Sequence, residues 1–88
     1  MKIRTKDADE AAFFWVQDGV VLAGTELEEP WHRRKVLWFV FDAADWDQPR
    51  LDAIRNDYLN GKTLVEPRAY AARRAEVKNM IRHEVFGR

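Results

Sequence analysis

An 88-residue chain without cysteine or serine has room for one hydrophobic core, and it excludes disulfides, thiolate metal sites and cysteine or serine nucleophiles. The formal net charge is zero, but acidic residues gather in the first third of the chain and basic residues in the last. This predicts complementary faces within the fold or a basic binding surface. Hydrophobic residues make up 47% of the chain and charged residues 34%. These values predict a single folded domain that spans residues 1–88.

The composition also bears on the compartment. No stretch reaches the roughly 18 apolar residues of a membrane span, and the first residues lack the apolar run of a signal peptide. A secreted domain of this size would normally carry disulfides. The sequence therefore predicts a cytoplasmic protein without a membrane partner, in the host cytoplasm if a phage encodes it.

The first predicted elements are a short strand over residues 2–5 and a helix that begins after Asp7. Asp7 can cap this helix, and Glu10 follows at the reciprocal spacing of a capping box. Alanines and aromatic residues recur on one side of the helix, which predicts close packing against a sheet. Gly19 is predicted to end the helix, because glycine adopts positive φ without strain.

Two strands are predicted next, over Val20–Leu27 and Lys35–Asp42. They are close in sequence, which favours an antiparallel hairpin. The second strand is apolar on both faces, so we expect it to be central and at least partly covered on both sides. In the first strand, the predicted faces hold Val20 and Leu22 on one side and Val21, Ala23 and Leu27 on the other.

Two further helices complete the predicted fold. Asp47 can cap the first of them, with Pro49 in its first turn and Asn60-Gly61 at its end. The last helix is predicted from Pro67 to about Val85, with Arg74 inside its apolar face and its charged head reaching solvent or a carboxylate. The predicted fold class is α+β, in the order β-α-β-β-α-α, with a small single-layer sheet that contains an antiparallel hairpin and is packed by helices.

The sequence gives little support to an enzyme. His32 and His83 lie far apart and outside any metal-ligand spacing. Asp42 and Asp45 could serve a metal-dependent nuclease, but the glycine and distal glutamate of a calcium loop are missing. We therefore predict no enzymatic activity, no metal and no cofactor.

Two basic surfaces are the candidate contact sites. One is the turn from Trp31 to Lys35, where arginine and lysine could contact phosphate and Trp31 could stack on an unpaired base. The other is an edge of the last helix. Each could also be an ordinary solvated surface. The candidate residues, for nucleic acid or a protein partner, are Trp31, Arg33, Arg34, Lys35, Arg68, Lys78 and Arg82.

Protein association is the leading hypothesis for function. The chain has four tryptophans, and exposed tryptophan and arginine dominate the energetics of interfaces. We expect a small non-enzymatic binding or accessory protein that contacts a protein partner or a second copy of itself as a homodimer. The alternative is a nucleic-acid-binding protein that uses the Trp31–Lys35 turn and the basic last helix.

The order of several short motifs carries a resemblance to a known family. The motifs are Thr5-Lys6-Asp7, Ala11 to Gly19, Trp38 to Asp42, Tyr58-Leu59-Asn60-Gly61 and Val65-Glu66-Pro67-Arg68-Ala69-Tyr70. In these motifs the chain resembles a family of short phage and prokaryotic proteins known only as a domain of unknown function. The resemblance implies a phage or mobile-element origin, and it implies no activity, because none is assigned to the family.

Overall fold

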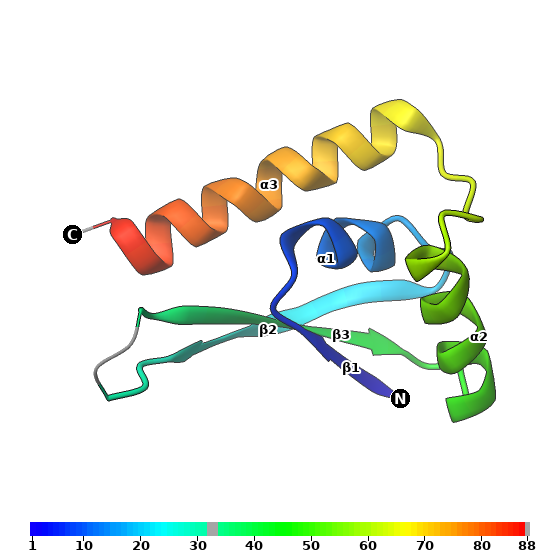
Figure 1. Cartoon of the computed structure of the whole chain (residues 1–88), viewed down its shortest axis with the longest axis horizontal. Helices are drawn as coiled ribbons and strands as arrows, with labels where there is room; N and C mark the ends of the chain where they lie inside the picture. Colours follow the sequence, from blue (N-terminus) through cyan, green and yellow to red (C-terminus); the bar gives the residue numbers. More distant parts are fainter. Residues whose placement is uncertain (32–33, 88) are drawn as a thin grey trace.

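The computed structural model describes residues 1–31 and 34–87, and within them the elements follow the predicted order. The strands are β1 (Lys2–Thr5), β2 (Val20–Glu28) and β3 (Val36–Ala43), and they form one antiparallel sheet in the order β1-β3-β2 (Figure 1). The helices are α1 (Ala8–Trp15), α2 (Gln48–Leu59) and α3 (Pro67–Phe86). The α+β class, the hairpin and the central position of the aromatic strand are therefore confirmed.

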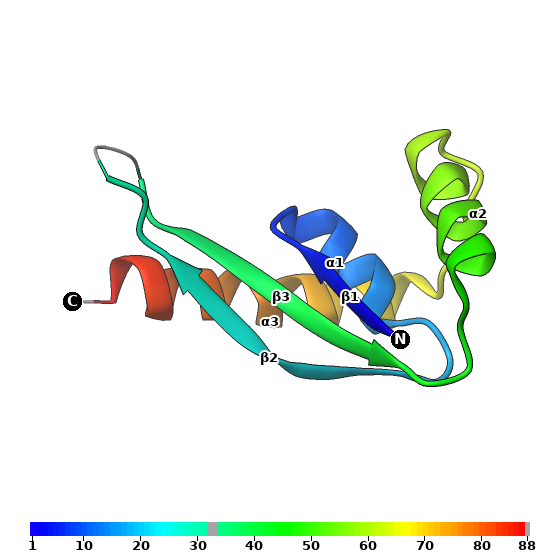
Figure 2. The same ribbon diagram turned by 90° about the horizontal axis from the view of Figure 1, so that it is seen from below.

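Helices α1 and α3 lie on the same face of the sheet, and α2 stands beside the end of β3 (Figures 1 and 2). Alternate residues of β3, among them Phe39 and Phe41, point toward the helices and are fully buried. Phe14 from α1 and Val77 from α3 meet them in the same core. One face of the sheet thus supplies the core.

The partial cover predicted for the other face of β3 is present, but no helix within the described residues supplies it (Figure 1). Trp38 is nevertheless only half-exposed. Arg4 of β1 and Glu26 of β2 form an ion pair of 2.6 Å across β3, and the Arg4 guanidinium lies 4.2 Å from the centre of the Trp38 ring. Long charged side chains can shield apolar surface with their stems, so the edge strands supply the cover themselves.

A β-bulge in β2 corrects the predicted faces of that strand. The pairing with β3 shifts between Leu22 and Gly24, and an extra residue in one strand reverses which face the following residues occupy. Leu27 consequently lies opposite Leu37, on the face toward the helices. The prediction that Leu27 shares a face with Val21 and Ala23 was wrong for this reason.

The first helix begins as predicted and ends earlier than predicted. The Asp7 carboxylate accepts a hydrogen bond of 2.9 Å from the Glu10 amide. The reciprocal half of the capping box is absent, because the Glu10 carboxylate pairs with Arg55 of α2 at 3.0 Å. The helix ends at Trp15, and Gly19, with φ of 77°, lies in the turn that leads into β2.

The later helices match their predicted bounds closely. Asp47 caps α2 by accepting a hydrogen bond of 2.9 Å from the Arg50 amide, and Gly61 takes a positive φ of 67° just beyond its end. Arg74 of α3 reaches a carboxylate as predicted, with Nε 2.6 Å from Asp9 of α1. The first turn of α1 therefore holds both other helices.

Candidate functional site

The sheet has a notch where β1 is shorter than β3. The pairing of β1 with β3 ends at Thr5 opposite Phe39, and the chain then leaves the sheet because Asp7 begins α1. Strand β3 continues to Val36 with β2 on one side. The C-terminal half of α3 lies over this part of the hairpin (Figure 1).

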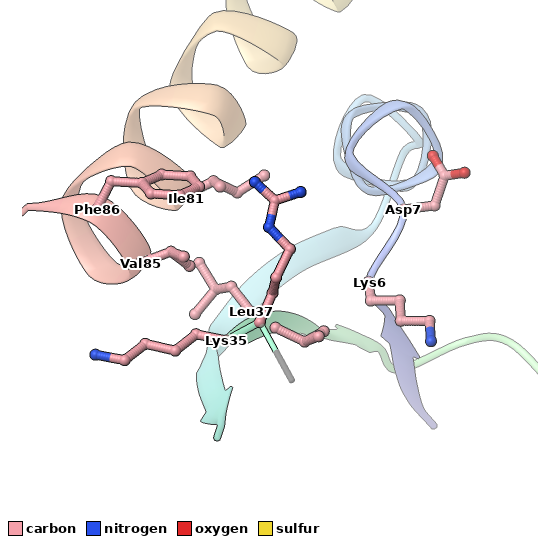
Figure 3. Close-up of a pocket in the computed structure, with 9 residues that line it drawn as sticks. Lys6, Asp7, Lys35, Leu37, Ile81, Val85 and Phe86 are labelled. Atoms are coloured by element: carbon pink, nitrogen blue, oxygen red, sulfur yellow. The ribbon is translucent and has the colours of Figure 1, made fainter. Parts of the chain in front are cut away.

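A hollow of about 550 Å³ occupies the notch (Figure 3). Its apolar lining comes from Val36, Leu37, Ile81, Val85 and Phe86, and its charged lining from Lys6, Asp7, Arg34 and Lys35. We call this hollow the hairpin groove. The side chains of Ile81, Val85 and Leu37 approach one another from α3 and β3, and Lys6 and Asp7 stand on the opposite wall (Figure 3).

The charge at the groove is predominantly positive. Lys35 pairs with Glu29 at 3.2 Å, and the Asp7 carboxylate is engaged in capping α1. Arg34 is exposed, and within residues 1–31 and 34–87 no carboxylate pairs with it. An apolar floor with a cationic rim can accommodate a ligand that is both apolar and acidic.

Helix α3 extends the positive rim. On a helix, residues three and four apart are neighbours, which places Lys78 beside Ile81 and Arg82 beside Val85. Lys78 and Arg82 are exposed, and neither forms an ion pair with another residue of the described chain. Their charges are thus available along the α3 edge of the groove.

The structure brings some of the predicted contact residues together and separates others. Arg34 and Lys35 line the groove, and Trp31, which is 87% exposed, precedes these two residues in the turn. Lys78 and Arg82 border the groove on α3. Arg68 lies in the first turn of α3, about 20 Å from Arg82 at 1.5 Å per helical residue. The predicted site residue Arg33, like His32, lies outside the described residues.

Sequence reasoning missed Lys6 and the apolar floor. Ile81 and Val85 belong to the apolar face of the last helix, but both are only half-buried, and Phe86 is 61% exposed. A signal for Lys6 was present, because the cap at Asp7 already limits the length of the first strand.

The two acidic residues considered for a nuclease, Asp42 and Asp45, have different surroundings. Asp42 pairs with Lys2 at 3.3 Å, and Asp45 is exposed in the turn after β3. In the part of the chain that the structure describes, no three histidine or acidic side chains are grouped to hold a metal ion. Among the same residues, no helix has the length and apolar character needed to cross a membrane.

The two tyrosines lie away from the groove, at the junction of the helices. Burial, followed by the nearby Asp7 carboxylate, raises the pKa of the Tyr58 phenol to about 12. Burial, followed by Asp9, also raises the pKa of Tyr70, whose hydroxyl donates to the Asp9 carbonyl oxygen at 3.5 Å. Both hydroxyls are therefore protonated near neutral pH and serve the packing of α2 and α3 on α1.

Comparison of the chain with models of protein families, with curated proteins and with solved structures gives no match. The candidate site therefore rests on its own geometry and charge.

Proposed function

We propose that the protein is a non-enzymatic binding module that acts through contacts with another protein, and that the hairpin groove is its site. The observation that carries the proposal is the apolar floor of Leu37, Ile81 and Val85 beside a cationic rim that includes Arg34. Exposed apolar surface rimmed by charge is typical of protein interaction sites. We further propose, from the resemblance described above, a phage or mobile-element origin and a location in the host cytoplasm.

Affinity capture with matched variants tests this proposal. The wild-type chain, Phe86→Asp in the groove and Leu64→Asp at the other end of the molecule are immobilised in parallel. Phe86 and Leu64 are both exposed, at 61% and 99%, so neither change should unfold the protein. We expect a protein that the wild type and Leu64→Asp retain and Phe86→Asp loses; equal retention by all three would contradict the proposal.

Self-association is a separate part of the same hypothesis. The free edge of β2, nine residues long, and the hairpin groove are both surfaces on which a second copy could pack. Light scattering coupled to size-exclusion chromatography, over a range of concentrations, measures the mass directly. A monomeric mass throughout would exclude the homodimer and leave contact with a different protein in place.

The second candidate function is nucleic-acid binding. It is supported by Arg34, Lys78 and Arg82, which have no carboxylate partner in the described chain, and by the exposed Trp31. Phosphate contacts make affinity fall steeply with salt. Labelled single strands and duplexes are titrated with the wild type and Arg34→Ala in a salt series. The affinity of the variant should fall less steeply with salt concentration than that of the wild type. Equal salt dependence would mean that Arg34 makes no phosphate contact.

A further inference from the structure

Where β3 borders the hairpin groove, its edge presents backbone groups that no strand of the described chain pairs with. The Ala43 amide donates to the Met1 carbonyl oxygen at 2.9 Å, and the Met1 amine donates to the Ala43 carbonyl oxygen at 3.0 Å. In an antiparallel ladder, every second residue directs both its N–H and its C=O to the same neighbour. Phe41, Phe39 and Leu37 therefore direct these groups toward the side of β1.

Of these three residues, Leu37 alone has no partner strand in the part of the chain that the structure describes. Thr5 stands opposite Phe39, whereas the position opposite Leu37 would belong to Asp7, which has already left the sheet. The Asp7 carbonyl oxygen accepts from Ala11 in α1. Among residues 1–31 and 34–87, no backbone hydrogen bond joins Leu37 to a residue on the β1 side.

The groove gives access to this edge. Leu37 is among the residues that line it, although the residue as a whole is only 4% exposed. A residue placed opposite Leu37 would share its face of the sheet, which is the face toward Ile81 and Val85. An apolar side chain at that position would fill the floor of the groove.

We propose that the hairpin groove binds its partner by strand addition: an extended segment of the partner continues the line of β1 along β3. Its central residue is apolar and exchanges hydrogen bonds with the Leu37 backbone. Acidic residues on either side of it approach Lys6 and Arg34. This inference rests on the proposed protein-binding function and specifies the partner as an extended, acidic and apolar segment.

Charge favours this edge of β3 over the free edge of β2 as the site of strand addition. Strand β2 carries Glu26 and Glu28, with Glu29 directly after it, so its edge would repel an acidic segment; it also contains a bulge, which discourages strand pairing. The notch in the sheet lies instead between Lys6 and Arg34, with Lys35 beside them. Complementarity of charge therefore favours an acidic segment at the notch.

Amide hydrogen exchange of the free protein is the first test. The Phe39 amide faces Thr5 within the ladder, whereas the Leu37 amide faces the groove. We expect the Leu37 amide to exchange at least about tenfold faster than the Phe39 amide, despite the burial of the Leu37 side chain. Equal protection of the two amides would mean that the edge is already occupied, and it would overturn the proposal.

A synthetic peptide of alternating glutamate and valine is the probe for the second test, since valine favours extended backbone. We expect it to bind and to slow exchange at Leu37. A peptide with lysine in place of glutamate, and one N-methylated at the central valine, should each bind roughly tenfold more weakly, through lost charge complementarity and a lost hydrogen bond. Absence of binding by the glutamate–valine peptide would overturn the proposal.

Protein variants locate the contact. Arg34→Glu should weaken binding of the glutamate–valine peptide by roughly tenfold, because it reverses a charge at the end of the notch. Arg68→Glu makes the same change at the far end of α3 and should leave affinity within about twofold. Equal losses in both variants would indicate attraction to the overall charge and would contradict strand addition at this edge.

The outcomes separate this inference from the function on which it rests. An acidic amphipathic helix that binds the groove and leaves Leu37 exchange unchanged would overturn strand addition, while protein binding would stand. Protection of Leu37 that rises with protein concentration alone would identify a second copy as the occupant and overturn the assignment to a different partner. Tight binding of oligonucleotide, with no binding of any peptide, would overturn both.

Discussion

At one end of the molecule, acidic residues in the first turn of α1 hold both other helices, whereas at the hairpin end the last turns of α3 are the only helical cover of the sheet among the described residues. Glu10 pairs with Arg55 of α2 at 3.0 Å, and Asp9 pairs with Arg74 of α3 at 2.6 Å. At the hairpin end, Phe86 is 61% exposed beside an apolar hollow. The difference indicates that packing at the helix junction contributes more to the stability of the fold than packing at the hairpin end, where we propose that binding occurs.

The largest expected effect comes from removing an aromatic ring at the closed end. Phe14 is fully buried and packs against Phe41 and Trp46, with ring centres 6.4 and 6.3 Å away. Phe14→Ala should lower the free energy of unfolding by about 3–5 kcal/mol, whereas Phe86→Ala should change it by less than about 0.5 kcal/mol. Urea denaturation measures both values, and similar losses would show that the two ends are equally packed.

The next effect concerns the link between α1 and α2. Glu10 is nearly buried, with its side chain 11% exposed, and it pairs with an Arg55 side chain that is 34% exposed. Glu10→Gln removes the charge that Arg55 faces and should cost about 1–2 kcal/mol. Amide exchange should increase in α2 before it increases in β3, and uniform acceleration would mean that α2 is held by other contacts.

Local patterns predicted the elements well because their causes are local. Asp7 and Asp47 accept hydrogen bonds from amides three residues further on, so the sequence spacing alone specifies where each helix begins. The apolar and β-branched residues of positions 35–42 likewise predicted a strand there, and β3 covers Val36–Ala43. These features depend on neighbours within a few residues, and the structure agrees with them.

Features that depend on distant residues could not be predicted in the same way. The Glu10 spacing fits a capping box, but Arg55, 45 positions away, offers a stronger charged partner. The bulge after Leu22 leaves the apolar pattern of β2 intact while reversing its faces. The hairpin groove arises because β1 is shorter than β3, and no single sequence motif predicts this difference in length.

The tyrosines allow the closed end to be tested by pH. Burial raises the pKa of Tyr58 from 10.0 to about 12, so between these values the unfolded chain loses a proton that the folded protein retains. Its contribution to stability is therefore complete below pH 10 and is lost as the pH rises toward about 12. Tyr58→Phe should make stability in this range less dependent on pH, and the phenolate absorbance should show Tyr58 ionising later than a free phenol.

The smallest expected effect compares two arginines on the same helix. Arg74 pairs with Asp9 at 2.6 Å, and Arg74→Gln should lower the midpoint of thermal unfolding only slightly, since both side chains are partly exposed. Arg82 has no carboxylate partner within the described chain, and Arg82→Gln should change the free energy of unfolding by less than about 0.5 kcal/mol. Thermal denaturation of the two variants and the wild type, measured in parallel, gives the difference in stability. A loss in Arg82→Gln as large as that in Arg74→Gln would mean that Arg82 serves the fold, and its charge would then not be available to a partner at the groove.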